Sequence, residues 1–167
     1  MPQPEAVNLI RPYRPADVDL LIDIFLSAVR ETASRNYTAA QIAAWTGQRT
    51  DRDQWLARRA SRPTWVAEAG GEIAGFTDLE PDGHVDMLFV HPAWQRRGVA
   101  GALLRHVEDQ ARAAGLGRLF TEASITARPV FERHGFRVVA AQDVAIGGQL
   151  LRNFRMEKRF ASPRGPG

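Results

Sequence analysis

Residues 90–104 of the chain read VHPAWQRRGVAGALL, and this stretch decides how the whole sequence is interpreted. An apolar, strand-like segment precedes it, Gly98 lies near its centre, and apolar residues at helical spacing follow. The free amides of a helix N-terminus bind phosphate oxygens, and glycine lets the backbone approach them closely. Arg96 and Arg97 add positive charge that suits the same anion. We therefore predict a phosphate-binding strand–loop–helix unit.

The same loop differs from two other kinds of nucleotide site. It lacks the Gly-Lys-Ser/Thr ending of a P-loop and the Gly-x-Gly-x-x-Gly of a dinucleotide fold. A glycine at a strand-to-helix turn is common in α/β proteins, so Gly98 needs support from the rest of the chain.

On both sides of the loop the sequence predicts short strands and helices. Before it we expect a strand at 9–13, helices beginning near residues 18, 38 and 51, and antiparallel strands at 64–68, 72–79 and 84–90. After it we expect a helix from residue 99, a strand at 119–123, a short helix at 129–134 and a hairpin of residues 136–146 and 149–158. This order predicts an α/β (α+β) fold: a central mixed, mostly antiparallel twisted sheet of about seven strands, flanked by helices on both faces.

The bulk composition fits a single globular domain. The chain has 167 residues, of which 44% are hydrophobic and 25% are charged. We expect residues 1–160 to form the domain. Residues 161–167 contain two prolines and no apolar pattern, so we expect a flexible C-terminal tail there.

Charge and residue types argue against several classes of function. The net charge of +3 comes without a dense Lys/Arg run, so we expect no nucleic-acid partner. The absence of cysteine excludes disulfides and a cysteine nucleophile, and the four histidines lack a close ligand spacing, so we expect no metal. There is no signal-peptide pattern and no apolar stretch near the roughly 20 residues that span a bilayer, so we expect a cytoplasmic protein without a membrane partner.

Several segments together resemble one enzyme family. Gln95-x-x-Gly98-x-Ala100 resembles the Gln/Arg-x-x-Gly-x-Gly/Ala signature of the GNAT superfamily of N-acetyltransferases. Three further segments resemble that family's fourth strand and its exit, its short helix ending in Gly-Phe, and its first strand and turn: residues 88–92, 127–136 and 10–17. The resemblance covers nearly the whole chain, residues 8–159, with its segments in the family's order.

This resemblance implies a site for acetyl-CoA as co-substrate. Loop amides would hold its pyrophosphate: those of Arg96, Arg97, Gly98, Val99, Ala100 and Gly101. The backbone of Leu88, Phe89 and Val90 would pair with the pantetheine arm as an added strand. An amide of Leu88 or Val90 would polarise the thioester carbonyl, in the gap between strands 84–90 and 119–123.

The implied reaction, acetyl transfer to a primary amine, needs a base. Asp86 is the first candidate, since strand alternation would place it beside Leu88 and Val90, where burial would raise the pKa of its carboxyl group. The alternative for Asp86 is a structural ion pair with an arginine. Glu122 is the second candidate, and Glu80 and His84 are more distant options.

Two further features bear on the chemistry. Without cysteine, we expect direct transfer rather than an acetyl-enzyme. The family often has a tyrosine as general acid four residues before the Gly of Gly-Phe, where this chain has Phe131. Phenylalanine cannot donate a proton, so the thiolate would leave unaided or through water. This absence also supports an alternative function, a non-catalytic acyl-CoA-binding or sensor module of the same fold.

The acceptor site is expected around the first two helices and the loop between them. Tyr37 and Trp45 would line an apolar pocket with polar tips, and packing in the helical core is the alternative for Trp45. We favour a small-molecule amine over a protein as the acceptor. The last hairpin, residues 137–158, could carry a homodimer contact.

Overall fold

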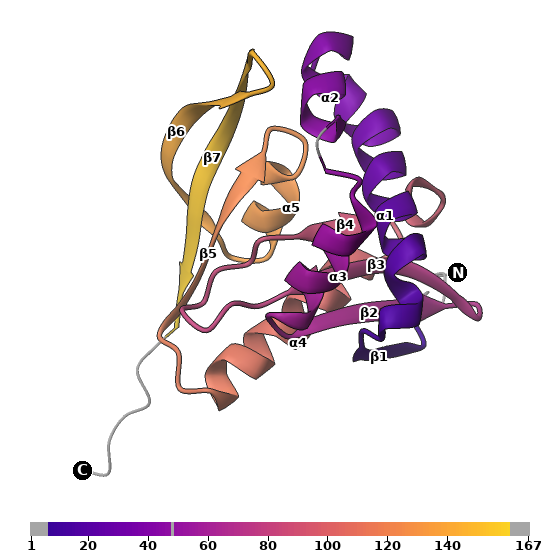
Figure 1. Ribbon diagram of the computed structural model, residues 1–167. Helices are drawn as coiled ribbons and strands as arrows, with labels where there is room; N and C mark the ends of the chain where they lie inside the picture. Colours follow the sequence, from indigo (N-terminus) through magenta and orange to yellow (C-terminus); the bar gives the residue numbers. More distant parts are fainter. Residues whose placement is uncertain (1–6, 48, 161–167) are drawn as a thin grey trace, which may run out of the picture.

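The computed structural model of the protein describes residues 7–47 and 49–160, so the predicted tail at 161–167 lies outside the described residues. Within them, seven strands form two antiparallel sheets, in the orders β1-β2-β3-β4 and β5-β7-β6 (Figure 1). A parallel bridge between His84 and Phe120 joins the two sheets. The predicted α/β class, with its mostly antiparallel strands, is confirmed.

The first sheet forms the centre of the fold. Its strands are β1 (Leu9–Pro12), β2 (Thr64–Ala69), β3 (Glu72–Asp78) and β4 (Leu88–Val90). Gly70 and Gly71 connect β2 to β3 with φ of 59° and 81°, a backbone conformation that glycine adopts without strain. The predicted hairpin over these residues is confirmed.

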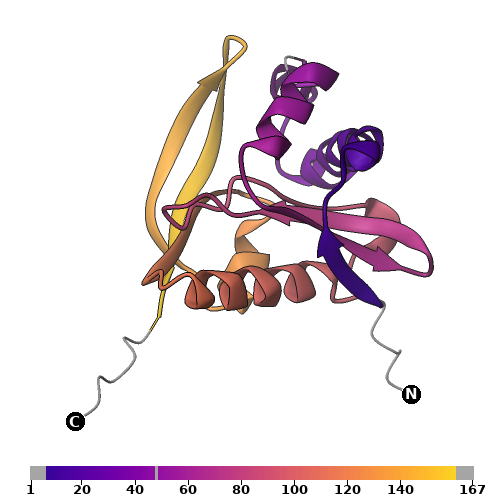
Figure 2. The same ribbon diagram turned by 60° about the horizontal axis from the view of Figure 1, so that its bottom comes forward.

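Helices cover both faces of this sheet (Figure 2). On one face lie α1 (Val18–Ser27) and α3 (Arg52–Ala60), with Phe25 and Trp55 packed on Phe76 of β3 in one core cluster. On the other face lies α4 (Val99–Ala113), which buries Val99 and Leu103 against small residues of β2 and β3. The predicted placement of helices on both faces is confirmed.

The segment after α1 brings the chain round to the second helix. A 3₁₀ turn (Pro15–Asp17) precedes α1. After α1 the chain continues as a short π-helix (Ala28–Thr32) and a second 3₁₀ turn (Ala33–Arg35). The helix α2 (Ala39–Thr46) then begins at Thr38, as predicted. The Thr38 hydroxyl accepts from the amide of Gln41 at 3.1 Å, and the Gln41 side chain accepts from the amide of Thr38 at 2.8 Å, which completes a capping box.

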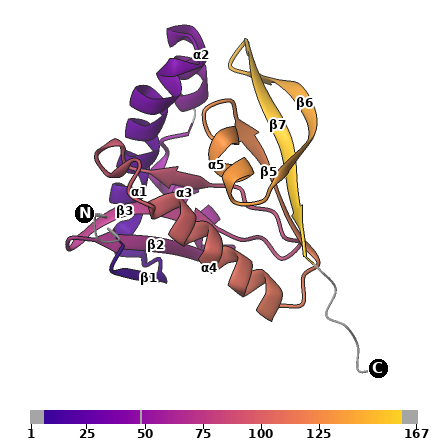
Figure 3. The same cartoon turned by 180° about the vertical axis from the view of Figure 1, so that it is seen from behind.

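The second sheet stands at the side of the molecule as a long hairpin with one shorter strand. Its strands are β5 (Arg118–Ser124), β6 (Arg137–Ile146) and β7 (Gln149–Arg159), and α5 (Arg128–Arg133) follows β5. The tip of the β6–β7 hairpin faces α2 (Figures 1 and 3), and the Gln41 side chain donates to the carbonyl of Leu150 at 2.8 Å. The hairpin and α2 therefore enclose one end of the molecule.

The predicted strand at 84–90 is wrong in its first half, because only Leu88–Val90 is a strand. The buried carboxylate of Asp78 accepts from the amides of Asp86 and Met87 at 2.9 and 3.1 Å, so these groups do not join the ladder of β3. The amide of Val85 instead donates to the carbonyl of Phe120 in β5 at 2.9 Å. The segment thus leaves the first sheet and crosses to the second, which separates β4 from β5.

Candidate active site

The predicted phosphate loop ends at the N-terminus of α4. Gly98 is the N-cap residue, with φ of 77°, and it has no side chain that could bond to the first amides of the helix. The first three or four amides of any helix lack an internal partner, so those of Val99, Ala100 and Gly101 remain available to an anion. A Cβ atom at Gly98 would have no heavy atom within 4 Å, so the surface beside it is open.

Arg96 carries a signal that the sequence analysis did not use. Among the described residues it is the one non-glycine residue with a positive φ, 61°. Such a conformation costs about 1–2 kcal/mol for an L-residue with a side chain. Strain of this kind clusters at functional sites, which supports the assignment of the loop. The guanidinium of Arg97 lies 5.2 Å from the centre of the Trp94 ring, in the short 3₁₀ turn Pro92–Trp94.

Close packing between helices explains why residue 101 is a glycine. A Cβ atom there would lie 2.8 Å from Cε1 of His134, so the small residue allows α4 to pack against the end of α5. Its amide remains part of the predicted site, but the absence of its side chain serves packing.

A narrow hollow of about 100 Å³ connects the loop to the gap between β4 and β5. Its walls include all three residues of β4 together with Gln95 and Ala100 on one side and Ser124 and Ala127 on the other. β4 is the edge strand of its sheet, so its outer backbone groups have no strand partner among the described residues. The predicted residues Leu88, Phe89, Val90 and Ala100 are therefore brought together.

A larger hollow of about 390 Å³ adjoins this one, which we call the acceptor hollow. The two share five lining residues: Trp45, Leu88, Phe89, Ser124 and Ala127. The acceptor hollow is also lined by Tyr37, His84, Asp86 and Glu122. Both predicted acceptor residues and both candidate bases therefore border the same space.

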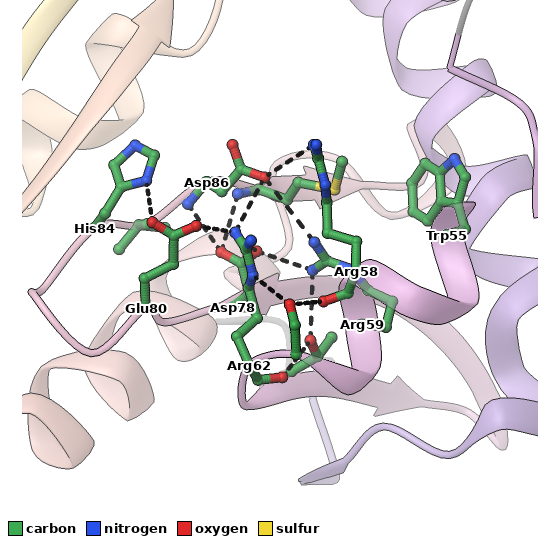
Figure 4. A network of polar contacts seen from close by, with 12 residues as sticks. Trp55, Arg58, Arg59, Arg62, Asp78, Glu80, His84 and Asp86 are labelled. Atoms are coloured by element: carbon green, nitrogen blue, oxygen red, sulfur yellow. Dashed lines mark hydrogen bonds and ion pairs between the residues drawn. The ribbon is translucent and has the colours of Figure 1, made fainter. Parts of the chain in front are cut away.

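Glu122 belongs to a chain of three ionisable groups. Its Oε2 atom lies 2.5 Å from Nε2 of His84. On the other side of the ring, Nδ1 of His84 lies 2.9 Å from Oε2 of Glu80 (Figure 4). The imidazole also stacks on the Phe120 ring at 5.0 Å. Burial lowers the pKa of His84, but the hydrogen bonds to Glu122 and Glu80 and the charges of both carboxylates outweigh it, so the pKa is raised above 6.5.

Asp86 lies among arginines instead of on a strand face. Its Oδ2 atom is 3.5 Å from Arg62, 3.8 Å from Arg58 and 4.0 Å from Arg59 (Figure 4). The side chain is 28% exposed, which differs from the buried position expected from strand alternation. That expectation fails because Asp86 is outside β4. The ion pair with an arginine, the alternative named for Asp86, is what the geometry shows.

The two aromatic residues predicted for the acceptor site contact each other, with ring centres 5.7 Å apart. Tyr37 is also a structural residue: its hydroxyl donates to the carbonyl of Arg152 at 2.5 Å and accepts from the amide of Ile125 at 3.0 Å. It thereby ties the segment before α2 to β7 and to the end of β5. Trp45 lines the narrow hollow as well as the acceptor hollow.

From the sequence, His84 and Glu80 were only distant options for the base, and the arginines around Asp86 were not predicted. Arg58 and Arg59 lie in the last turn of α3, and Arg62 follows shortly after the helix ends at Ala60. Nothing in the local sequence connects them to residues 78–86, because the contact arises from the packing of α3 beside β3.

Phe131 is buried and packs on Phe136 with ring centres 5.0 Å apart, so it has a core role. In residues 7–47 and 49–160, no group of three or more His, Cys, Asp or Glu side chains is arranged to hold a metal ion. Across the same ranges, no helix has both the length and the apolar character needed to cross a membrane.

Comparison with known proteins places this geometry in context. Residues 33–160 match the family described as acetyltransferase (GNAT) domain. The chain is 40% identical over 147 residues to YafP of Escherichia coli K12, an uncharacterized N-acetyltransferase. The matched residues cover 88% of this chain and 93% of YafP.

Solved structures show the same fold. A GCN5-related N-acetyltransferase from Rhodopseudomonas palustris is 31% identical, with a TM-score of 0.89 over 95% of this chain and 99% of that one. The PaiA N-acetyltransferase of Thermoplasma acidophilum, in complex with coenzyme A, is 18% identical with a TM-score of 0.75 over 91% and 98% of the two chains. YncA of Salmonella typhimurium, with its cofactor acetyl-CoA, is 23% identical with a TM-score of 0.72 over 95% and 97%.

Proposed function

Because this chain belongs to the GNAT acetyltransferase family, we propose that it transfers the acetyl group of acetyl-CoA directly to a primary amine of a small molecule. The observation that carries the proposal is the position of the two hollows. The narrow hollow lies beside the N-terminus of α4, where Gly98 is the N-cap residue. The acceptor hollow is lined by Glu122 and His84, which contact each other, and five residues line both hollows.

The donor end is built to hold a phosphate-bearing ligand by its backbone. We propose that the amides of residues 96–101 bind the pyrophosphate, with Arg96 and Arg97 adding charge near it. The outer edge of β4 then pairs with the pantetheine arm, and an amide of Leu88 or Val90 donates to the thioester oxygen as negative charge develops there.

We assign the role of base to Glu122, with His84 beside it. The amine nitrogen attacks the thioester carbonyl carbon, the C–S bond breaks, and the amine loses a proton to the Glu122–His84 pair directly or through one water. The products are the N-acetyl amide and the CoA thiol. Glu122 is 43% exposed, so the captured proton can pass on to solvent.

Asp86 remains the second candidate for this role. It borders the same hollow, but three arginines lie within 4.0 Å of its Oδ2 atom, so its carboxylate already has a place in an ion-pair network. Glu122 is more exposed than Asp86, 43% against 28%, and its contact with His84 continues to Glu80, so a captured proton can be shared along this chain. These two features favour Glu122.

At the position where the family often has a tyrosine as general acid, this chain has Phe131, which is buried and cannot donate a proton. A CoA thiol is a good leaving group, and we propose that the thiolate is protonated by water. The alternative function, an acyl-CoA-binding sensor, is favoured by this one feature alone.

An amine panel separates the two functions. The chain has no cysteine, so a thiol reagent added to the reaction detects released CoA without interference from the protein. We expect amine-dependent thiol release with at least one class of small amine. Tight acetyl-CoA binding without release by any amine would support the sensor instead.

A further inference from the structure

A third hollow, of about 790 Å³, lies between α2, α3 and the tip of the β6–β7 hairpin. Its described lining includes four arginines and no Asp or Glu: Arg49, Arg58, Arg59 and Arg62. We call it the arginine hollow. Trp45, Arg49, Met87 and Ile146 line both it and the acceptor hollow, so a cationic wall adjoins the place proposed for the amine.

Carboxylates outside the arginine hollow balance only part of the positive charge of its four arginines. Arg59 and Asp78 form a fully buried ion pair at 2.9 Å, Arg62 pairs with Glu80, and Arg58 lies 3.8 Å from Asp86 (Figure 4). None of these three carboxylates lines the arginine hollow. Arg49 has no carboxylate within 4.0 Å among the described residues. Four guanidinium groups thus face three carboxylates, and the hollow has an excess of positive charge.

The most deeply placed arginine also has free hydrogen-bond donors. The side chain of Arg59 is 0% exposed, yet its Nε and Nη2 atoms make no hydrogen bond to the described residues. Oδ2 of Asp86 lies 4.0 Å from Nη2, too far for a hydrogen bond, and it also lacks a donor. Buried donors of this kind are rare in folded proteins and call for an acceptor. A carboxylate or a water reaching Arg59 through the arginine hollow would supply one.

The two adjoining hollows differ in charge. The acceptor hollow holds Glu122 and Asp86, which suit the cationic or neutral amine end of a substrate. The arginine hollow suits an anionic end, and the planar fork of a guanidinium matches a carboxylate with two parallel hydrogen bonds. Trp45 lies at the boundary and offers an apolar surface between the two ends.

We propose that the acceptor is zwitterionic, an amine that also carries a carboxylate, with the carboxylate held by Arg49 and Arg58 above Arg59. This inference rests on the proposed acetyl transfer. Polycationic amines are excluded by the same wall, because every arginine that lines it would repel a second ammonium group.

The test uses matched pairs of acceptors that differ only in the anionic group. Glycine, L-phenylalanine, β-alanine and 4-aminobutyrate are each compared with their carboxamides, by acetyl-CoA-dependent thiol release. We expect kcat/KM for the preferred carboxylate to exceed that for its carboxamide by at least about 10-fold, the size of a charge-assisted hydrogen bond.

Variants of exposed arginines then locate the effect. Arg58→Gln should raise KM for the carboxylate about 10-fold and leave the carboxamide unchanged, and Arg49→Gln should do the same without touching Asp86. Arg52→Gln is the matched control, since Arg52 lies on the same helix, pairs with Asp19 and does not line the hollow. It should change neither substrate.

The outcomes that overturn the inference are distinct from those that overturn the function. Equal use of carboxylate and carboxamide, or a preference for spermidine, would overturn the zwitterionic acceptor while leaving acetyl transfer intact. A preference for aminoalkyl phosphonates over carboxylates would overturn the assignment of a carboxylate as the anionic group of the acceptor. Failure of every amine, with acetyl-CoA still bound, would overturn both.

Discussion

The donor end and the acceptor end of this site are built from different materials. The donor end lies within residues 88–101 and is made mostly of backbone, from β4 to the first turn of α4. The proposed acceptor end is made of side chains that come from α2, α3, residues 84–89, β5 and the β6–β7 hairpin. The first is local in sequence and the second is assembled only by folding.

This difference explains why one end of the proposed site could be recognised from the sequence and the other could not. A backbone site needs particular conformations, such as the positive φ of Gly98, and these leave a short readable pattern. A side-chain site needs only that suitable groups meet in space, and no spacing in the sequence records their meeting. The proposed site for acetyl-CoA could therefore be predicted from a short motif, while the proposed acceptor site could not.

The largest expected effect separates the two candidate bases at the acceptor end. Glu122→Gln should lower kcat by about 10²- to 10⁴-fold with little change in KM for acetyl-CoA, because it removes the proton acceptor and keeps the side-chain shape. Asp86→Asn should cost less, since its carboxylate is engaged by arginines. Steady-state kinetics of both variants decides the matter, and the opposite ranking would make Asp86 the base.

At the donor end, Gly98→Asp should weaken acetyl-CoA binding about 100-fold or more, because a negative side chain would enter the anion site. Gly115→Asp is the matched control: that glycine, just after α4, has φ of 76° and equally open space. Calorimetry should show nearly normal affinity for the control. Equal losses in both would mean that strain, rather than the phosphate site, weakens binding.

A smaller effect concerns the pH dependence of the Glu122–His84 pair. Both carboxylates hold the pKa of His84 above 6.5, so the pair gains basicity as pH rises through that pKa. Glu80→Gln removes one of these carboxylates and should lower the pKa, which moves the acid limb of kcat/KM to lower pH. The acceptor's own pKa is the same in both profiles, so an unmoved acid limb would remove His84 from the catalytic unit.

The smallest effect on activity is expected at Tyr37, where the consequence is for stability. Tyr37→Phe leaves the amide of Ile125 and the carbonyl of Arg152 without the hydroxyl, and should lower the free energy of unfolding by about 1–3 kcal/mol. Urea denaturation measures this loss. Wild-type stability with altered amine selectivity would instead show that the hydroxyl contacts the acceptor.

The fold was largely predictable because its turns and caps are local. The glycine pair at 70–71, the capping box at Thr38 and the apolar periods all act over a few residues. The strand at 84–90 was wrong because the carboxylate of Asp78, several residues away, takes the amides that the ladder would have used. Local pattern cannot reveal such a competitor.

The candidate site was predictable in the same uneven way. The residues of the loop and of β4 could be grouped from the sequence because they adjoin along the chain, and the three residues of β4 line one hollow together with Ala100. Glu122 and His84 contact each other although 38 residues separate them in the sequence. Asp86 forms an ion pair with Arg58 of α3, which lies far earlier in the chain. Arg96 was noted for its charge, while its unusual backbone was invisible without coordinates.

Direct transfer of the acetyl group can be tested by following the release of CoA thiol. Stoichiometric acetyl-CoA is mixed with the protein, and free thiol is followed before and after an amine is added, with no protein cysteine to interfere. With direct transfer, we expect almost no thiol release until the amine is added, followed by one equivalent of thiol. A burst of one thiol per protein before the amine would reveal an acetyl-enzyme and contradict direct transfer.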